Sequence, residues 1–144
     1  MALGTAEFDP VTAGWSEREA GGFTDLVGPL WARRDSEGWA YGLLAGPQHA
    51  NVHGIVHGGM LMTLIDNALG LTVWEATGRQ PAVTMQLNTQ FIAAARPGDF
   101  IEARGEVLRV ARSVVFVRGV LSVRGETVLA ADGVWKVIRS SNQK

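Results

Sequence analysis

Residues 51–74 read NVHGIVHGGMLMTLIDNALGLTVW, a stretch rich in glycine and histidine that runs into a long apolar segment. Between Met60 and Trp74 the apolar residues cover most of the circumference of a helix instead of forming one stripe. A helix that is apolar nearly all round is usually a buried helix. The stretch therefore predicts a buried central helix over residues 60–74, preceded by a loop over residues 45–59.

On either side of this helix the sequence has the pattern of β-strands. Before it, residues 30–34 and 38–44 flank a polar, glycine-containing turn, which predicts a hairpin. After it, four further strands are expected over residues 82–92, 100–110, 113–124 and 127–138. The order of a hairpin, one helix and four meandering strands predicts an α+β fold, in which a long curved antiparallel sheet wraps around one buried helix.

The first of these four strands is expected to place its apolar and polar residues on opposite faces. The apolar face would hold Val83, Met85, Leu87 and Phe91, and the polar face Thr84, Gln86, Asn88 and Gln90. The polar face carries no charge, which suits a half-buried interface, although an ordinary solvated sheet face could have the same composition.

The length and composition of the chain narrow the class of protein. A chain of 144 residues suggests a single domain, and the absence of cysteine excludes disulfides, thiolate nucleophiles and zinc sites built on cysteine. A formal net charge of −1 gives no support to nucleic-acid binding. Residues 1–8 lack a basic region followed by an apolar run, and residues 60–74 are too few and too polar for a membrane span. A cytoplasmic location without membrane contact is therefore expected.

The chain is expected to divide into an N-terminal lead-in, residues 1–24, and a single domain, residues 25–144. Ser16 is followed by a glutamate three residues later, the spacing of a capping box, which predicts a short helical turn. Two glycines would end this turn, and residues 23–27 would add one more.

The glycine pair Gly58-Gly59 lies where the predicted helix begins. The first N–H groups of a helix have no partner within it and carry the positive end of its dipole. Glycine lets a ligand approach the backbone closely, so such an end can polarise a carbonyl group and hold a developing oxyanion. A plain turn into the helix would use the same residues, and this interpretation is also open.

Asp66 is the single acidic residue between Glu37 and Glu75 and falls in the middle of the apolar helix. A carboxylate in apolar surroundings is costly unless it is paired or hydrogen-bonded, and no Lys or Arg stands three or four positions away. Asp66 is therefore a candidate general base or nucleophile facing a polar cavity. The alternative is a carboxylate exposed on a narrow polar strip, or one bonded to Thr63 or Asn67.

Three histidines, His49, His53 and His57, fall within nine residues. Such a cluster could bind zinc, but the glycines between them argue for a loop, and no second carboxylate lies nearby as a ligand. No metal and no cofactor is therefore expected. His57 is instead expected to orient a neighbour by a hydrogen bond, or to be a satisfied loop histidine.

Gly58 and Asp66 are separated by eight residues, which is about 12 Å along a helix. One carbonyl carbon cannot lie near both groups of the same helix. If both groups serve one site, they come from two chains, and an isologous dimer then carries two equivalent sites.

The spacing of Asn51, then His57-Gly58-Gly59, then Asp66 resembles that of the hotdog-fold thioesterases, and specifically the PaaI-like acyl-CoA thioesterase group. The resemblance extends over residues 25–138. It implies a hotdog fold, hydrolysis of an acyl-CoA thioester to the free acid and CoA, no metal, and a dimer or a dimer of dimers.

The same resemblance implies a role for each matching residue. The Gly58 N–H and the Asn51 side chain would polarise the thioester carbonyl, while His57 would help to hold the loop. Asp66 of the partner chain would activate water or attack the carbonyl itself. Thr84 stands where the family has a hydroxyl residue, familiarly serine, that orients the water.

Contacts to the rest of the substrate are less specific. Gly59 is expected beside the substrate at the start of the helix. Arg96, Arg109 and Arg112 lie near predicted strand ends, where they could meet the phosphates of coenzyme A or be solvated surface side chains. The resemblance singles out Arg112 and Ser113, because the family often has an arginine-containing turn there.

Two other functions share part of this pattern. Hydratases and dehydratases of the same fold use an Asp/His pair five residues apart, or a histidine loop followed by Phe-Pro-Gly, and neither pattern occurs here. A non-catalytic acyl-CoA sensor would keep the fold and the pocket without needing Asp66. The residues leave open whether the acyl group is aryl, short or medium in length, and whether the protein is a dimer or a tetramer.

Overall fold

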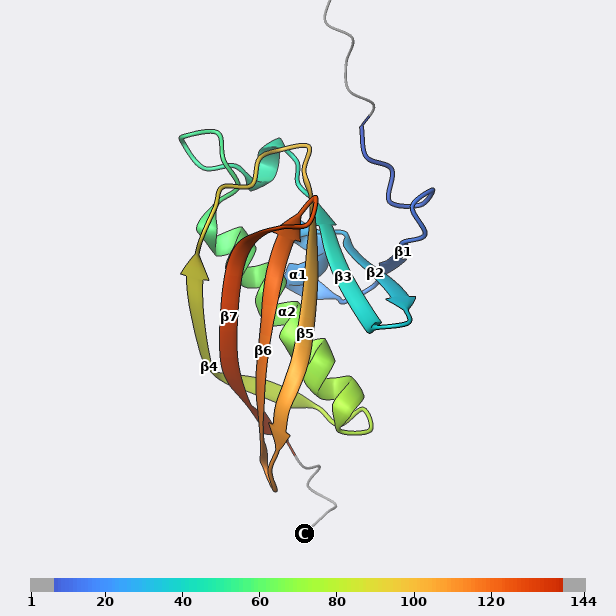
Figure 1. Ribbon diagram of the computed structural model, residues 1–144, viewed down its shortest axis with the longest axis vertical. Helices are drawn as coiled ribbons and strands as arrows, with labels where there is room; N and C mark the ends of the chain where they lie inside the picture. Colours follow the sequence, from blue (N-terminus) through green and yellow to red (C-terminus); the bar gives the residue numbers. More distant parts are fainter. Residues whose placement is uncertain (1–6, 139–144) are drawn as a thin grey trace, which may run out of the picture.

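The computed structural model describes residues 7–138 as one seven-stranded antiparallel sheet that curves around a single long helix (Figure 1). The strands are β1 (Ser16–Arg18), β2 (Leu30–Asp35), β3 (Gly38–Leu44), β4 (Ala82–Phe91), β5 (Phe100–Val110), β6 (Val114–Val123) and β7 (Glu126–Val137). The helical elements are α1 (Gly22–Val27), η1 (Pro47–His49) and the central α2 (Gly58–Ala76). The predicted α+β architecture of a hotdog fold is confirmed.

The strands lie in the order β1-β2-β3-β5-β6-β7-β4. The predicted β2–β3 hairpin is confirmed, and β5, β6 and β7 follow one another as a meander. The prediction that all four long strands meander was wrong for β4, which pairs with β7 and not with β5. The reason is the connection over residues 92–99, which carries the chain across one end of the sheet before β5 begins (Figure 1). Strand β4 is thereby left at the edge of the sheet with one neighbour.

Helix α2 buries one stripe of side chains against the inner face of the sheet. The stripe consists of Leu61, Leu64, Ile65, Ala68, Leu69 and Val73. The predicted buried central helix is confirmed. Its side away from the sheet stays accessible, because the sheet curves around one side of α2 only: Met62 is 37% exposed, and Asp66 and Trp74 are half-buried. The helix also begins two residues earlier than predicted, at Gly58. Within residues 7–138, no helix combines the length and the hydropathy needed to span a lipid bilayer.

The lead-in forms a strand where a short helical turn was predicted. Residues Ser16–Arg18 pair with β2 as β1, so the capping-box prediction was wrong. Trp15 is buried with Trp31 and Ala40 on the outer face of the sheet, and this packing holds the segment in an extended conformation. The helical turn predicted for residues 23–27 is confirmed as part of α1.

A β-bulge in β4 changes which of its side chains share a face. The register of β4 against β7 shifts between Thr84 and Gln86, so Met85 is the extra residue. Thr84 lies opposite Trp135, which is buried in the core, whereas Gln86 lies opposite Val134. Because residues directly opposite in an antiparallel pair share a face, Thr84 points toward α2. The prediction that Thr84 shares a face with the polar residues after it was therefore wrong.

Candidate active site

His57 closes the start of α2. Its Nδ1 accepts a hydrogen bond of 2.8 Å from the Gly59 N–H, as the side chain of an N-cap residue does. A neutral imidazole whose Nδ1 accepts carries its hydrogen on Nε2. The Gly58 N–H has no acceptor among the described residues, and Phe91 at the end of β4 lies 3.2 Å from the position of a Cβ on Gly58. One backbone donor is thus free at the start of α2.

Asn51 is part of the loop that leads into α2. Its Oδ1 accepts hydrogen bonds from the His53 N–H at 2.9 Å and from the N–H two residues further on at 3.4 Å. These bonds use the amide oxygen and leave the Asn51 NH₂ group as the donor that can bind a ligand. A bridge between Ala50 and Val56 folds the loop back on itself, so Asn51 and Gly58 belong to the same end of the molecule.

The three histidines have different surroundings. His49 is buried, with its Nδ1 accepting from the Gly46 N–H at 2.9 Å and its Nε2 2.5 Å from the Val27 carbonyl oxygen. Its own carbonyl oxygen accepts a hydrogen bond of 2.7 Å from the His57 N–H, so His49 anchors the loop that leads into α2. His53 is exposed. This anchoring role of His49 was not predicted, because no local pattern distinguishes His49 from the other two histidines. Residues 7–138 hold no group of three side chains that could bind a metal ion.

Asp66 lies on the half-buried side of α2. Its Oδ1 accepts a hydrogen bond of 2.6 Å from the Thr84 hydroxyl on β4. No Lys or Arg of the described chain forms an ion pair with it. Thr63 donates to a backbone carbonyl one turn back, and Asn67 accepts from Thr24 on α1 at 3.2 Å. The alternative in which Asp66 bonds to Thr63 or Asn67 was therefore wrong.

Two cavities meet at Asp66. A cavity of about 530 Å³ runs from Asp66 and Thr84 along α2 to Trp74. Another, of about 390 Å³, extends toward Phe23 of α1 and Met62. Pockets of several hundred Å³ with a few convergent polar groups are typical of small-molecule sites. The hydroxyl–carboxylate pair therefore faces space that a substrate can enter.

Trp74 forms the far end of the 530 Å³ cavity and was not predicted as a site residue. The guanidinium carbon of Arg18 lies 5.4 Å from the centre of its ring, and that of Arg79 lies 5.1 Å away. Both contacts have the geometry of cation–π interactions. The sequence could not identify Trp74 as a site residue, because a tryptophan in an apolar helix can equally belong to the core. Its contact with Arg18 could not be predicted either, because the two residues are far apart in the chain.

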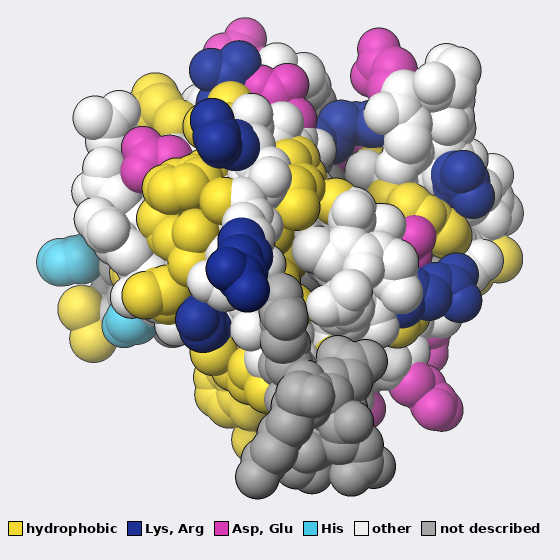
Figure 2. All heavy atoms as spheres, turned by 90° about the horizontal axis from the view of Figure 1, so that it is seen from below, with side chains coloured by type: hydrophobic (Ala, Val, Ile, Leu, Met, Phe, Trp, Pro, Cys, Tyr) yellow, Lys and Arg dark blue, Asp and Glu magenta, His cyan; other side chains and the backbone are white. Residues whose placement is uncertain are grey.

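Arg112 and Ser113 lie in the turn between β5 and β6, at the opposite end of α2 from Gly58 (Figure 1). The Ser113 carbonyl accepts from the Val137 N–H at 2.9 Å. Hydrophobic side chains gather at this end of the molecule, with Lys and Arg side chains among them (Figure 2). The exposed apolar residues of the segments that reach this end are Val83, Met85, Leu108, Val110, Phe116 and Ile138. Within one chain, therefore, Arg112 and Ser113 lie far from Gly58 and Gly59 at the start of α2.

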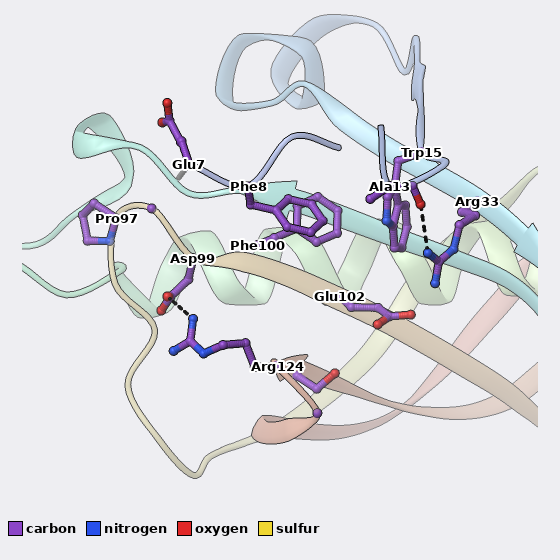
Figure 3. A pocket seen from close by; sticks show the side chains of 13 residues that line it. Glu7, Phe8, Ala13, Trp15, Arg33, Pro97, Asp99, Phe100, Glu102 and Arg124 are labelled. Carbon is purple, nitrogen blue, oxygen red and sulfur yellow. Dashed lines mark hydrogen bonds and ion pairs between the residues drawn. The ribbon is translucent and has the colours of Figure 1, made fainter. Parts of the chain in front are cut away.

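A larger cavity, of about 1000 Å³, lies on the outer face of the sheet, where the lead-in crosses it (Figure 3). Phe8 stacks on Phe100 with ring centroids 4.6 Å apart, and the Arg33 guanidinium lies 4.6 Å from the Trp15 ring. The Arg124 guanidinium is 3.0 Å from a carboxylate of the β4–β5 connection. Its arginines already have partners and it contains none of the predicted site residues, so this cavity reflects packing of the lead-in.

The family model of the thioesterase superfamily matches residues 53–130, more than half of the chain. This chain therefore belongs to the thioesterase superfamily. The resemblance inferred from the spacing of Asn51, His57-Gly58-Gly59 and Asp66 is confirmed for the family, while the roles of the individual residues stay predictions.

Two relatives carry names related to ester hydrolysis. A protein from Pseudomonas aeruginosa, named as an esterase, is 33% identical over 113 residues, which make up 77% of this chain and 84% of the relative. The human protein named acyl-coenzyme A thioesterase 13 is 27% identical over 86 residues, which make up 60% of this chain and 61% of that protein. Both names agree with the family.

Solved structures share the fold. A Bacillus halodurans protein whose crystal structure contains CoA matches with a TM-score of 0.70 and 29% identity, over 76% of this chain and 74% of that chain. The Escherichia coli PaaI protein, from the phenylacetic acid degradation operon, matches with a TM-score of 0.65 and 20% identity, over 71% of this chain and 73% of that chain. The second likeness supports the fold alone.

Proposed function

We propose that this chain is an acyl-CoA thioesterase, which hydrolyses an acyl-CoA thioester to the free acid and CoA. The thioesterase family, the name of the human relative and the CoA in the Bacillus structure support this reaction. The observation that carries the proposal is the hydrogen bond from Thr84 to Asp66 at the edge of a cavity. It engages one carboxylate oxygen and leaves the other for chemistry.

In the proposed reaction the Thr84 hydroxyl, which donates to Asp66, accepts a hydrogen bond from a water molecule. The water oxygen bonds to the thioester carbon while the second carboxylate oxygen of Asp66 takes its proton. The carbonyl oxygen becomes an oxyanion, which the Gly58 N–H and the Asn51 NH₂ group stabilise. When the carbonyl re-forms, the carbon–sulfur bond breaks and the CoA thiolate takes the proton. No metal or cofactor takes part, since coenzyme A belongs to the substrate.

A second route keeps the same groups. Asp66 attacks the thioester carbon itself and expels the CoA thiolate, which forms a mixed anhydride that water then hydrolyses. In this route Thr84 holds the carboxylate in the orientation for attack. Both routes need an oxyanion site near the carbonyl, and His57 keeps the start of α2 in place for it.

The site is proposed to be shared between two copies of the chain. Gly58 and Asp66 lie on the same helix, eight residues and about 12 Å apart, so one carbonyl group cannot contact both within one chain. A two-fold axis that sets two α2 helices antiparallel would place Gly58 of one copy near Asp66 of the other. The same operation creates two equivalent sites.

Strand β4 is the surface proposed to hold the two copies together. It pairs only with β7, and its other edge is open within residues 7–138. None of its ten residues is charged, whereas proteins usually protect an exposed edge with charges. Met85 and Phe91 are 62% and 53% exposed. An uncharged, partly apolar edge suits pairing with a second β4, and larger assemblies such as a dimer of dimers would be built on that pair.

Antiparallel pairing of β4 with its copy has a further consequence for the substrate. The two copies would run in opposite directions, so the turn with Arg112 and Ser113 in one copy would lie toward the start of α2 in the other. This placement supports Arg112, Ser113 and Gly59 as proposed contacts of the CoA portion, with the Arg112 guanidinium matched to phosphate.

Two other functions are the alternatives. A non-catalytic acyl-CoA sensor would use the same fold and cavity without turnover. A hydratase or dehydratase would need an acid–base pair suited to adding or removing water at a carbon–carbon bond. The side-chain partner of Asp66 is a hydroxyl and not an imidazole, which favours the hydrolase.

The test is thioester hydrolysis by the purified protein across a panel of acyl-CoA esters, followed with a chromogenic thiol trap. Wild type is expected to release CoA, and Asp66→Asn to lose at least a hundredfold in kcat. Asp132→Asn, the same change at an exposed position of β7, serves as the control and is expected to keep wild-type activity. A wild-type protein that hydrolyses none of the esters contradicts the hydrolase, and a fully active Asp66→Asn contradicts the assigned mechanism.

A further inference from the structure

The 530 Å³ cavity beside Asp66 follows the axis of α2. The helix residues that line it recur at spacings of one, three and four, so they form a single stripe. They are Asp66, Asn67, Gly70, Leu71 and Trp74. The opposite wall comes from Leu30 of β2 and from residues 81–84 at the start of β4. The cavity is thus an elongated space with the Asp66–Thr84 pair at one end and Trp74 at the other.

The wall that α2 and β4 form beyond the carboxylate is apolar. Beyond Asp66 the space is bounded by Leu71 and Trp74 on the helix and by Val83 on the strand. The other charged residues of the lining are Arg18 and Glu19 at the end of β1, and the Arg18 guanidinium lies over the Trp74 ring at the far end. Such a wall suits a hydrocarbon chain better than the amides or phosphates of coenzyme A, because burying those polar groups without partners is costly.

The length of the cavity follows from the helix. Trp74 lies eight residues after Asp66, which corresponds to about 12 Å at the rise of an α-helix. An extended saturated chain of roughly eight to ten carbons covers that distance, given carbon–carbon bonds of about 1.5 Å. The Trp74 ring is held by Arg18 and Arg79, so the far end is a braced wall. Arg18 lies outside residues 53–130, the part matched by the family model, so this end wall depends on the chain's own lead-in.

We propose that this cavity is the acyl site, that it favours straight apolar acyl groups of roughly eight to ten carbons, and that Trp74 sets the upper limit. The inference rests on the proposed thioesterase function and names its substrate class.

Gly70 offers a direct way to shorten the site. It lies in the lining stripe between Asp66 and Trp74, and a Cβ placed on it would be 3.4 Å from Trp135 Nε1, which is an ordinary contact distance. A leucine at this position can therefore enter the cavity without a clash of its Cβ with the backbone. Ala76→Leu adds the same side chain at an exposed position of α2 and serves as the matched control.

The experiment measures kcat/KM for saturated acyl-CoA esters from acetyl to dodecanoyl. For wild type, kcat/KM is expected to rise roughly threefold to fourfold per methylene up to octanoyl or decanoyl, and then to stop rising. In Gly70→Leu the ratio of decanoyl to acetyl activity is expected to fall more than tenfold, whereas Ala76→Leu keeps the wild-type ratio. In Trp74→Ala the preference is expected to extend to longer chains. Circular dichroism and thermal unfolding establish whether each variant is folded. If Gly70→Leu does not fold, the chain-length profile of Trp74→Ala tests the proposed acyl site.

Three results would overturn the inference. One is a wild-type rate that does not depend on chain length. Another is a Gly70→Leu variant that loses the same factor with every ester, which would assign the cavity to the CoA portion. The third is an unchanged profile in Trp74→Ala. If wild type hydrolyses no ester, the proposed function fails separately. The cavity is then tested by calorimetry with a non-hydrolysable octyl-CoA thioether, which should bind wild type at least tenfold more tightly than Gly70→Leu.

Discussion

The Thr84 hydroxyl donates a hydrogen bond of 2.6 Å to Asp66, although the two residues are 18 positions apart and lie on different elements. The contact exists because the bulge at Met85 turns Thr84 to the inner side of β4 while the residues after it keep their register with β7. Without that extra residue, Thr84 would share the outward face of Gln86. A local irregularity of one edge strand thus supplies the side-chain partner of the candidate base.

Thr84 is predicted to position the attacking water and the carboxylate. Thr84→Val keeps the shape but removes the hydroxyl, so kcat should fall by about tenfold to a hundredfold with little change in KM. Thr84→Ser keeps the hydroxyl and should restore most of the activity. Steady-state kinetics with one good acyl-CoA substrate measures both. Equal activity of the valine and serine variants would remove Thr84 from the mechanism.

A site shared between chains predicts complementation. Gly58→Val keeps the backbone N–H but places a branched side chain beside Phe91, where it blocks the approach of the carbonyl group, and Asp66→Asn removes the carboxylate. Each variant should therefore be inactive alone, because every site in either homodimer is defective. After mixing and subunit exchange, half of the dimers are mixed and each has one intact site, so about a quarter of wild-type activity should return. Native mass spectrometry verifies the exchange. Verified exchange with no return of activity would show that both groups act within one chain.

His57 is predicted to act through the structure of the loop and not as an acid or base. Its Nδ1 caps α2 by accepting from Gly59, and asparagine is one of the best N-cap residues. His57→Asn should therefore keep the stability and most of the activity, whereas His57→Ala should lose about 1 kcal/mol of unfolding free energy. Thermal and urea unfolding, together with the thiol-trap assay, make the comparison. An inactive but stable His57→Asn would assign proton transfer to the imidazole.

Tyr41 on β3 is predicted to make the fold sensitive to alkali. Burial raises the pKa of its hydroxyl to about 12, with Glu75 adding to the rise and Arg18 opposing it, and the hydroxyl has no hydrogen-bond partner among the described residues. Between pH 10 and 12 the unfolded chain loses this proton while the folded chain keeps it. The contribution of this group to the free energy of unfolding is therefore fully present below about pH 10. It is lost as the pH rises toward 12, by up to roughly 2–3 kcal/mol.

The measurement is direct, because Tyr41 is the single tyrosine of the chain. Tyrosinate absorbance should appear near pH 12, or together with unfolding, and not near pH 10. Tyr41→Phe should match or exceed wild type at neutral pH, since it removes a buried hydroxyl without a partner, and should lose less stability in alkali. A midpoint near pH 10 in the folded protein would show that the hydroxyl is solvated, and a large loss of stability in Tyr41→Phe at neutral pH would show that the hydroxyl has a hydrogen-bond partner.

The hairpin, the central helix and the extents of the long strands could be predicted from the sequence, because they depend on local patterns. Two apolar runs around a polar turn give β2 and β3, and the predicted strand over residues 100–110 coincides with β5. The start of α2 could be located to within two residues, because glycine content and apolar pattern act over a few residues, whereas its cap by His57 was not predicted. Ser16 shows the limit of such patterns: its capping-box spacing was overridden by pairing with β2 and by the burial of Trp15.

By itself, then, the sequence determined the hairpin, the central helix and the long strands, the family pattern from Asn51 to Asp66 and, through the rise of the helix, the separation of Gly58 from Asp66. Only the tertiary structure decided that β4 lies at the edge beside β7, that Thr84 faces Asp66, and that Arg18 braces the Trp74 wall of the cavity. The physical reason is the range of the interactions. Periodicity and capping act within a turn or two of chain, whereas strand order, a bulge and a cavity wall depend on which distant segments pack together.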